Sequence, residues 1–169
     1  MELFDILDKD GKPMGCTAPK GTQLQDGQYY LGIHAYIFNS SMEFLLQQRS
    51  YDKAFRPGAW DVVLEHAIAG ETSNECAIRG IKEEVGLHIN KDAVFFAGRL
   101  IWDEFHHIVD IYFAKADFSL DALTLEHGKV IGAKLVSKDE MLEFISNMHY
   151  RPEADNYRRF IAHEISKLA

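Results

Sequence analysis

Cysteine is scarce in this chain. Only Cys16 and Cys76 occur among 169 residues, far apart and in unrelated sequence contexts. A disulfide framework and a cysteine-based zinc site both need more cysteines or a closer spacing. Both kinds of site are therefore excluded, and we expect Cys16 and Cys76 to be small packing residues.

Long apolar runs are absent as well, because none approaches the roughly 20 residues that a membrane-spanning helix requires. The first residues, MELFDILDKDGKP, carry acidic side chains where a secretory signal has a basic region followed by an apolar one. We therefore expect a cytoplasmic protein that has no membrane partner.

Dense blocks of lysine and arginine are also missing. The chain has 18 Lys and Arg against 26 Asp and Glu, which gives a formal net charge of −8. This charge argues against a nucleic acid polymer as the main partner, because clustered basic side chains bind the phosphate backbone. A small phosphorylated ligand is compatible with it, since a bound divalent ion can outweigh the global charge.

The length and composition are those of one globular unit. A chain of 169 residues can bury a genuine core, and its 47% hydrophobic and 26% charged residues are ordinary for a soluble protein. We expect a single domain over residues 1–169. Its first part would be an N-terminal hairpin over 1–20, and its last part would be C-terminal helices over 137–169.

Strands are expected to outnumber helices. Asp10-Gly11 is a turn signal inside the N-terminal hairpin. Apolar patterns predict further strands over 29–38, 43–48, 60–64, 93–102, 108–116 and 129–136, and helices over 138–147 and 156–168. With one more helix in mid-chain, this order predicts an α/β (α+β) fold in which helices cover a mixed sheet.

The mid-chain helix is predicted by the stretch HAIAGETSNECAIRGIKEEVGL, residues 66–87. Thr72 and Glu75 have the spacing of a capping box, and Gly86 suits a left-handed helix stop. The apolar positions at helical spacing, which would form the buried stripe, are Ala77, Ile78, Ile81 and Val85.

Two adjacent acids, Glu83 and Glu84, lie on the helix face opposite that stripe, together with Gly80. Carboxylate oxygens are hard ligands that favour magnesium, manganese or calcium over zinc. An adjacent acid pair is also common on a solvated helix surface. The pair by itself therefore does not define a metal site.

The wider context resembles the signature of the Nudix hydrolases, here over residues 65–87. That signature is a glycine, five residues, Glu, seven residues, Arg-Glu, an aliphatic residue, any residue, Glu-Glu, any residue, Gly and an aliphatic residue. This sequence departs from the signature at Glu65, where the first glycine belongs, and at Gly80, where the glutamate after the arginine belongs. The matching positions are Glu71, Arg79, Ile81, Glu83, Glu84, Gly86 and Leu87.

Further segments resemble the Nudix branch related to isopentenyl diphosphate isomerases. These segments are DILDKDGKPMG, LLQQRS and PGAWDV. Isomerases of this branch have a metal-binding histidine at the position of His66 and a catalytic cysteine two residues earlier. Isomerisation by their route is disfavoured, because Leu64 stands at the cysteine position and can neither donate nor accept a proton.

The resemblance implies a Nudix-type α/β/α sandwich with a central mixed sheet, which binds Mg²⁺ or Mn²⁺. The implied catalytic residues are Glu83, Glu71 and Arg79, with Glu71 and Arg79 bracing the loop against the helix. The implied or candidate metal ligands are Glu83, Glu84, Glu65 and Glu104, the last of these in WDEFHHIVD beside His106 and His107. We also expect Arg49 and Lys53 to contact phosphate.

Two interpretations of the altered signature stay open. Gly80 removes a principal metal ligand, and Lys129 puts a cation where some relatives have a carboxylate, so the chain could bind without cleaving. Alternatively, Glu65 supplies the carboxylate that Gly80 lacks, and the glycine makes room for it.

From the resemblance as a whole we expect a hydrolase that cleaves the diphosphate linkage of a small nucleoside-diphosphate or related metabolite. The alternatives are an impaired Nudix-fold binding or regulatory domain and an isomerase-like enzyme, and relatives often form homodimers.

Overall fold

A computed structural model describes the whole chain, residues 1–169. Its first element is an antiparallel hairpin of β1 (Leu3–Leu7) and β2 (Pro13–Pro19). The Asp8 carboxylate accepts hydrogen bonds from the backbone N–H groups of Asp10 and Lys12, which closes the turn. The predicted hairpin is confirmed. Cys16, which was expected to be a small packing residue, is instead exposed on β2.

The main sheet has seven strands and is mixed, as predicted. β3 and β8 pair in parallel, whereas the other strand pairs are antiparallel. The order along the sheet is β5-β4-β3-β8-β7, with β6 beside β3 and β9 beside β4. The strands are β3 (Tyr30–Phe38), β4 (Phe44–Arg49), β5 (Trp60–Asp61), β6 (Val63–His66), β7 (Val94–Trp102), β8 (His107–Lys115) and β9 (Val130–Val136).

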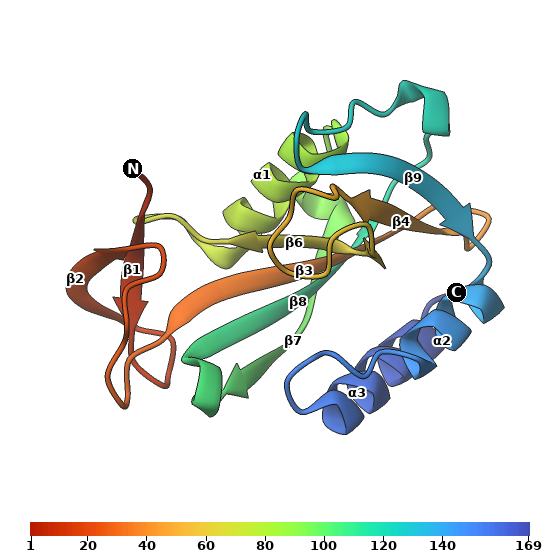
Figure 1. The fold of residues 1–169 in the computed structure, drawn as a ribbon. Helices are drawn as coiled ribbons and strands as arrows, with labels where there is room; N and C mark the ends of the chain where they lie inside the picture. The colour runs from red at the N-terminus through yellow and green to blue at the C-terminus, as the bar shows by residue number, and fades with distance from the viewer.

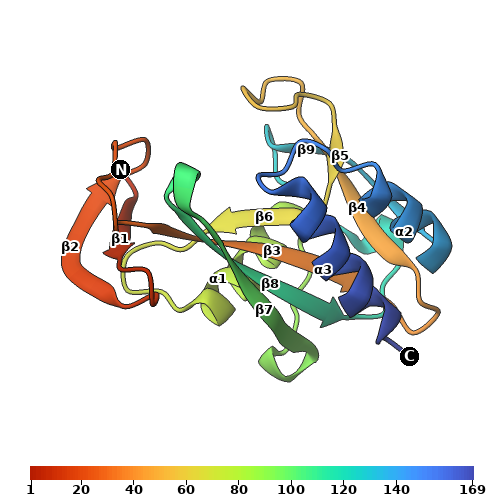
Figure 2. The same ribbon diagram turned by 90° about the horizontal axis from the view of Figure 1, so that it is seen from below.

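Helices cover both faces of this sheet. Figure 1 shows α1 (Ser73–Val85) on one face and the pair α2 (Lys138–Ser146) and α3 (Ala154–Ser166) on the other. From below, α3 lies across β3 and β8 (Figure 2). Three short 3-10 turns complete the chain, namely η1 (Lys91–Ala93), η2 (Asp103–Phe105) and η3 (Leu120–Ala122). The architecture is the expected α/β/α sandwich, and none of its helices is long and apolar enough to cross a bilayer.

Local signals in the sequence set the ends of α1. Thr72 and Glu75 form both halves of the capping box, and Gly86 ends the helix in the left-handed conformation with φ 76°. Both features are as predicted. The face of α1 that packs on the sheet consists of Cys76, Ala77, Ile81 and Val85, which are fully buried.

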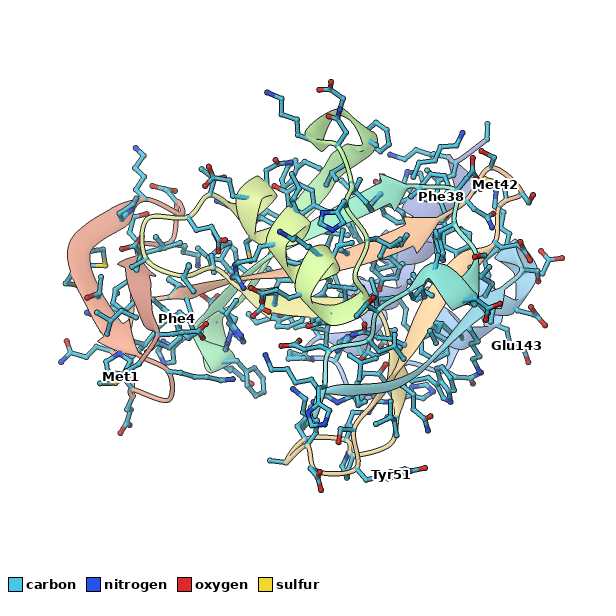
Figure 3. The ribbon with its side chains drawn as sticks, turned by 90° about the horizontal axis from the view of Figure 1, so that it is seen from above. Met1, Phe4, Phe38, Met42, Tyr51 and Glu143 are labelled. Atoms are coloured by element: carbon cyan, nitrogen blue, oxygen red, sulfur yellow. The ribbon has the colours of Figure 1, made fainter.

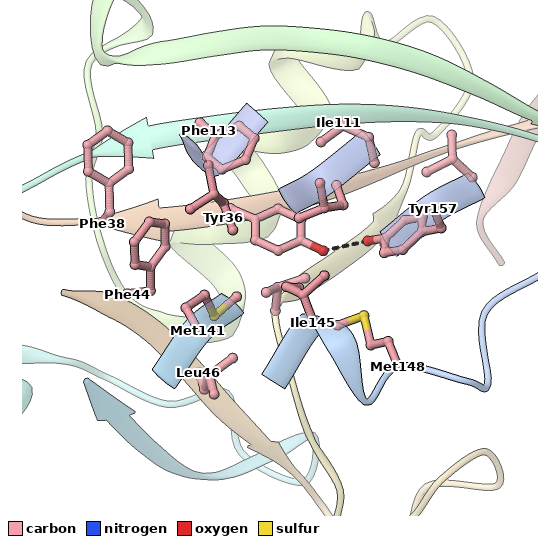
Figure 4. Packing of buried hydrophobic residues seen from close by; sticks show 14 of the residues in the cluster. Tyr36, Phe38, Phe44, Leu46, Ile111, Phe113, Met141, Ile145, Met148 and Tyr157 are labelled. Carbon is pink, nitrogen blue, oxygen red and sulfur yellow. Dashed lines mark hydrogen bonds between the residues drawn. The ribbon is translucent and has the colours of Figure 1, made fainter. Parts of the chain in front are cut away.

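The core beneath the sheet combines aromatic and aliphatic side chains. Tyr36 on β3 and Tyr157 on α3 are fully buried, and their hydroxyl groups lie 2.6 Å apart (Figure 4). Nδ1 of His34 lies 2.7 Å from the same Tyr157 oxygen. This polar chain gives each buried group a partner, so α3 is held in one orientation on the sheet.

Asp61 joins two segments that are distant in sequence. Its buried carboxylate accepts hydrogen bonds from Arg56, at 3.2 Å, and from the buried Arg151 between α2 and α3. Arg56 belongs to the loop that follows β4, which projects from the sheet with the labelled Tyr51 at its outer edge (Figure 3). The loop is therefore tied to the C-terminal helices.

Candidate functional site

Arg79 on α1 braces the loop that precedes the helix. Its Nε and Nη2 donate to the two carboxylate oxygens of Glu71 at 2.7 and 3.0 Å, and Nη2 also donates to the backbone oxygen of His66 at 2.9 Å. One Glu71 oxygen in turn accepts the backbone N–H of Ile68 at 3.1 Å. The expected contact between Glu71 and Arg79 is thus present, with bidentate geometry that fixes both side chains.

The remaining nitrogen of Arg79 faces two further acids. Nη1 lies 3.2 Å from the Glu83 carboxylate and 3.6 Å from the Glu65 carboxylate. The charge of Glu83 contributes to a raised pKa of Glu65, although burial of Glu65 is the larger cause. Glu65 and Glu83 therefore share one guanidinium nitrogen as their counter-ion.

Glu65 packs against the helix position that lacks a side chain. A Cβ at Gly80 would lie 3.0 Å from Cβ of Glu65 and 3.3 Å from its Cγ. Glycine inside a helix costs about 1 kcal/mol relative to alanine, so this position needs a packing reason. The structure supplies one, because the Glu65 side chain occupies the space that a residue at position 80 would need.

Glu84 is the buried acid of the pair on α1. Only 8% of it is exposed, and its carboxylate accepts a hydrogen bond from Nε2 of the buried Gln47 on β4. Burial, together with the negative charges of Glu65 and Glu126, raises the pKa of Glu84 to about 8, and the Gln47 hydrogen bond opposes this shift. The repulsion among these carboxylates would be relieved by a cation.

Glu83 and Glu84 were expected to point the same way, and the structure separates them. The Glu83 side chain is 44% exposed and points to Arg79, whereas Glu84 is buried against the sheet beside Gly80. Successive residues on a helix differ by about 100° in direction, so neighbours seldom share a packed face. We call Glu65, Glu83, Glu84 and Glu126 the acid cluster.

Two of the residues around the acid cluster had not been recognised from the sequence. Gln47 hydrogen-bonds to Glu84, and Glu126 lies beside it, since its backbone N–H donates to the Glu84 backbone oxygen at 3.0 Å. No sequence signal points to Glu126. Gln47 lies within LLQQRS, where strand alternation places it on the face of β4 that holds the buried Leu45.

Lys53, one of the two residues expected to contact phosphate, lies near the acid cluster. Burial and the charges of Arg49 and Lys129 lower the pKa of Lys53, and the charge of Glu84 opposes this. Lys53 therefore lies within electrostatic reach of the buried acid. Arg49 is partly engaged elsewhere, because its Nε donates to the backbone oxygen of Phe55 at 3.0 Å and shapes the loop.

Glu104 does not join the acid cluster, which corrects the expectation for this residue. It lies exposed in η2, the turn that joins β7 to β8 at the end of the sheet near the N-terminal hairpin (Figure 1). This turn is held in place by the Tyr29 hydroxyl, which donates to Asp103 at 2.5 Å. The C-terminal end of α1, which carries Glu83 and Glu84, lies away from it.

His66 and His107 form a pair near the hairpin. Their Nε2 atoms lie 3.0 Å apart, and Nδ1 of His107 donates to the Phe105 backbone oxygen at 2.7 Å. Burial lowers the pKa of both rings, to about 4 for His66. With both rings neutral, His107 must accept at Nε2 and His66 must donate there.

This pair lines a cavity of about 350 Å³ between the hairpin and η2. Phe4 stacks on His66 with ring centroids 5.6 Å apart, and the wall also includes Tyr30 and the exposed Phe105. Lys20 lies at the same cavity, and its charge also reaches Lys53. The cavity is therefore aromatic, and Lys20 adds one positive charge to its wall.

The donor set of the acid cluster suits a hard cation, although no three His, Cys, Asp or Glu side chains are grouped closely enough to form a metal site. The available donors are carboxylate oxygens, which magnesium and manganese prefer. In addition, the Oε1 atom of buried Gln47 has no hydrogen-bond partner. An orphaned buried oxygen beside repelling carboxylates fits such an ion.

Comparisons with known proteins give one consistent family. The model of the NUDIX domain matches residues 29–162. A Nudix hydrolase of Listeria monocytogenes is 32% identical, over 90% of this chain and 89% of its own length. Nudix hydrolase 3 of Arabidopsis thaliana is 36% identical over 86% of this chain, which spans 20% of that protein's length. An isopentenyl-diphosphate Delta-isomerase of Pectobacterium atrosepticum is 31% identical, over 66% of this chain and 65% of its own.

Solved structures share the fold. A protein of Deinococcus radiodurans superposes with a TM-score of 0.71 at 17% identity, covering 98% of both chains. The NUDIX domain of Shewanella oneidensis NrtR, complexed with ADP ribose, superposes with a TM-score of 0.60 at 15% identity, covering 88% of this chain and 93% of its own.

Proposed function

The chain belongs to the Nudix family, and we propose that it is a hydrolase that cleaves the diphosphate linkage of a small nucleoside-diphosphate derivative or related metabolite. The proposed cofactor is Mg²⁺ or Mn²⁺. This proposal goes beyond family membership, because the signature lacks a carboxylate at Gly80. It therefore depends on how the chain replaces that group.

The observation that carries the proposal is the packing of Glu65 against Gly80. The Glu65 side chain fills the space beside the helix where a position-80 side chain would stand, since a Cβ added at Gly80 would lie 3.0 Å from Cβ of Glu65. A carboxylate lost from α1 is thus matched by one that enters from β6. The exchange would keep an acid close to Glu84, whose pKa is raised chiefly by burial and further by the charge of Glu65.

The residues proposed to hold the ion are Glu65, Glu83 and Glu84. When bound, such an ion neutralises the diphosphate, orients it and lowers the pKa of the attacking water. The chain's own groups do the rest. Arg79 fixes Glu71 and the loop, Lys53 and Arg49 add positive charge for phosphate oxygens, and the half-exposed Glu83 carboxylate can accept a proton.

The aromatic cavity is the proposed place for the group attached to the diphosphate. Its wall offers the faces of Phe4, Tyr30 and Phe105, which suit a flat ring. Lys20 in the cavity and Lys53 near Glu84 lie within electrostatic reach of one another. A ligand that bridges them would place its ring in the cavity and its charged oxygens toward the acid cluster.

A second candidate is a binding domain without turnover. It is favoured by the internal counter-ions, since Arg79 pairs with Glu65 and Glu83 while Lys129 pairs with Glu126. An isomerase-type reaction is weaker, because Leu64 is half-buried against the core and has no proton to exchange.

Hydrolysis tests the proposal directly. The protein is incubated with a panel of nucleoside diphosphate derivatives, ADP ribose among them, with and without Mn²⁺, and released nucleoside monophosphate and phosphate are measured. Metal-dependent release that Glu83→Gln abolishes is the expected result. Ligand binding without any release identifies the binding domain instead, and release unchanged by Glu83→Gln contradicts the proposed role of Glu83.

A further inference from the structure

Glu126 comes to the acid cluster from the loop before β9. Its backbone N–H donates to the Glu84 backbone oxygen at 3.0 Å, and the preceding Thr124 makes the same kind of bond to Val85 at 3.0 Å. These bonds attach the loop to the C-terminal end of α1. The Glu126 side chain is thus held beside Glu84 by the fold, although 42 positions separate the two in the printed sequence (126 − 84).

The Glu126 carboxylate is only half satisfied. One oxygen, Oε1, pairs with Nζ of Lys129 at 2.8 Å, whereas Oε2 is buried and has no hydrogen-bond partner. A buried carboxylate oxygen without a donor is costly. The charge of Glu126 is also among the causes that raise the pKa of Glu84, so the two carboxylates face each other's field.

Gln47 supplies a second and independent observation that points to a cation ligand. It is 6% exposed, and its Nε2 group donates to Glu84. This bond places the amide in the acid cluster, yet its Oε1 atom has no partner. An amide oxygen and carboxylate oxygens are the ligand types that hard divalent ions take in proteins.

Lys129 provides the positive charge next to Glu126, while Arg79 pairs with Glu65 and Glu83. The pKa of Lys129 is raised chiefly by the hydrogen bond to Glu126, and the charges of Glu65 and Glu84 raise it further. The ammonium group therefore lies in the field of all three acids. Its long and flexible stem lets it leave without a change in the backbone.

We propose that Glu126 is a further ligand of the metal ion assigned above to Glu65, Glu83 and Glu84, that the unpartnered Oε1 of Gln47 also serves this ion, and that the Lys129 ammonium competes with it. This inference rests on the proposed function and deepens it. It assigns to Glu126 a role that the signature does not contain. It also makes Lys129 a competitor of the metal.

The test measures Mn²⁺ binding to the full chain by calorimetry and by the paramagnetic resonance signal of free Mn²⁺, without substrate. Glu126→Gln is expected to weaken binding about tenfold or more, as loss of a coordinating or supporting group does at metal sites. Lys129→Met is expected to tighten binding, because it removes the competing ammonium. Glu143→Gln, exposed on α2 and labelled far from α1 in Figure 3, is the matched control and should bind like wild type.

The opposite signs of the two variants make the test decisive. If the Glu126–Lys129 ion pair were purely structural, Glu126→Gln and Lys129→Met would change Mn²⁺ binding by the same small amount, and that result overturns the inference. If Glu126→Gln does not fold by circular dichroism, Lys129→Met decides alone, and unchanged or weaker binding overturns the inference. If wild type hydrolyses its substrate with Mn²⁺ while both variants bind as it does, only this inference fails. If wild type binds no Mn²⁺, the metal-dependent function fails with it.

Discussion

The side chain of Glu65 and the backbone of Gly80 share one small volume. A Cβ at position 80 would approach Glu65 Cβ to 3.0 Å, which is closer than nearly all real Cβ contacts. Positions 65 and 80 therefore cannot both carry large side chains without a shift of the strand or the helix. We propose that the acid that the Nudix signature places on the helix comes from the strand in this chain.

Exchanging these two residues is the sharpest test of that relationship. Gly80→Glu alone is expected to weaken Mn²⁺ binding and lower the melting temperature, because the new side chain meets Glu65. Glu65→Gly alone removes the carboxylate and also weakens binding. The double variant, which restores the family arrangement, should bind at least as well as wild type. Additive losses in the double variant would contradict a shared volume.

Glu84→Gln is expected to separate stability from binding. Glu84 is 8% exposed and lies in the field of Glu65 and Glu126, so a neutral amide of the same shape removes a repelling buried acid. The melting temperature should stay equal or rise, while Mn²⁺ binding should fall at least about tenfold. Circular dichroism melting and calorimetry measure the two quantities on one sample. A lower melting temperature with unchanged binding would show that Glu84 is structural.

Arg79→Lys is expected to cost stability and activity together. Lysine cannot make the two parallel bonds to Glu71 and also reach the His66 carbonyl group. We expect a loss of about 2 kcal/mol in the free energy of unfolding. Urea unfolding measures this loss, and hydrolysis should fall as the loop loses its brace.

Arg99→Lys serves as the control for that experiment. Arg99 makes a similar bidentate pair with Asp110, at 2.6 and 2.9 Å, between β7 and β8. Its replacement should lower stability by a similar amount and leave Mn²⁺ binding unchanged. Equal effects of both variants on Mn²⁺ binding would mean that Arg79 acts only through overall stability.

Phe105→Ala tests the aromatic cavity. Phe105 is 54% exposed and lines the cavity, so its truncation should change stability little but raise the KM for substrates that carry a ring. Phe95→Ala is the matched control, since Phe95 is 49% exposed near the other end of β7. Steady-state kinetics on a ring-bearing and a ring-free diphosphate provide the readout. An unchanged KM in Phe105→Ala would remove the cavity from the substrate site.

The buried His34 predicts a pH dependence of stability. Burial lowers its pKa well below 6.5, the charge of Arg151 adds to this, and its Nδ1 contacts the Tyr157 hydroxyl. Below that pH the unfolded chain takes up a proton that the folded chain refuses, so the free energy of unfolding falls as pH falls. One such group contributes at most about 1.4 kcal/mol per pH unit.

Urea unfolding between about pH 7 and pH 5 measures this slope, which should be shallower in His34→Gln than in wild type. His163→Gln, exposed on α3, is the control for histidine removal. Identical slopes in all three proteins would show that His34 does not contribute to the pH dependence.

Local signals predicted much of the fold, and distant contacts account for what they missed. Thr72, Glu75 and Gly86 lie within a few residues of the ends that they define, so spacing alone located α1. The parallel pairing of β3 with β8 joins segments far apart in sequence, and no pattern within either strand specifies a parallel partner. Cys16 was misassigned because β2 lies at the edge of the molecule, with one buried residue.

In the candidate site, too, local patterns predicted some contacts, and distant contacts account for the rest. The contact between Arg79 and Glu71 follows from the signature, and the structure contains it. Glu104 was favoured because it lies beside two histidines in sequence, yet η2 carries it to the far end of the sheet. Glu126 was missed because only the docking of its loop on α1 brings it to Glu84.

Asp61 links the C-terminal helices to the loop that carries Lys53. Its carboxylate receives Arg56 from the loop after β4 and Arg151 from the connection before α3. Shortening the chain ahead of Arg151 would leave the buried Asp61 carboxylate with Arg56 as its one remaining ion-pair partner. The loop that carries Arg56 and Lys53 would then be the first segment to shift. Residues outside the acid cluster would then govern the position of the lysine that we propose as a phosphate contact.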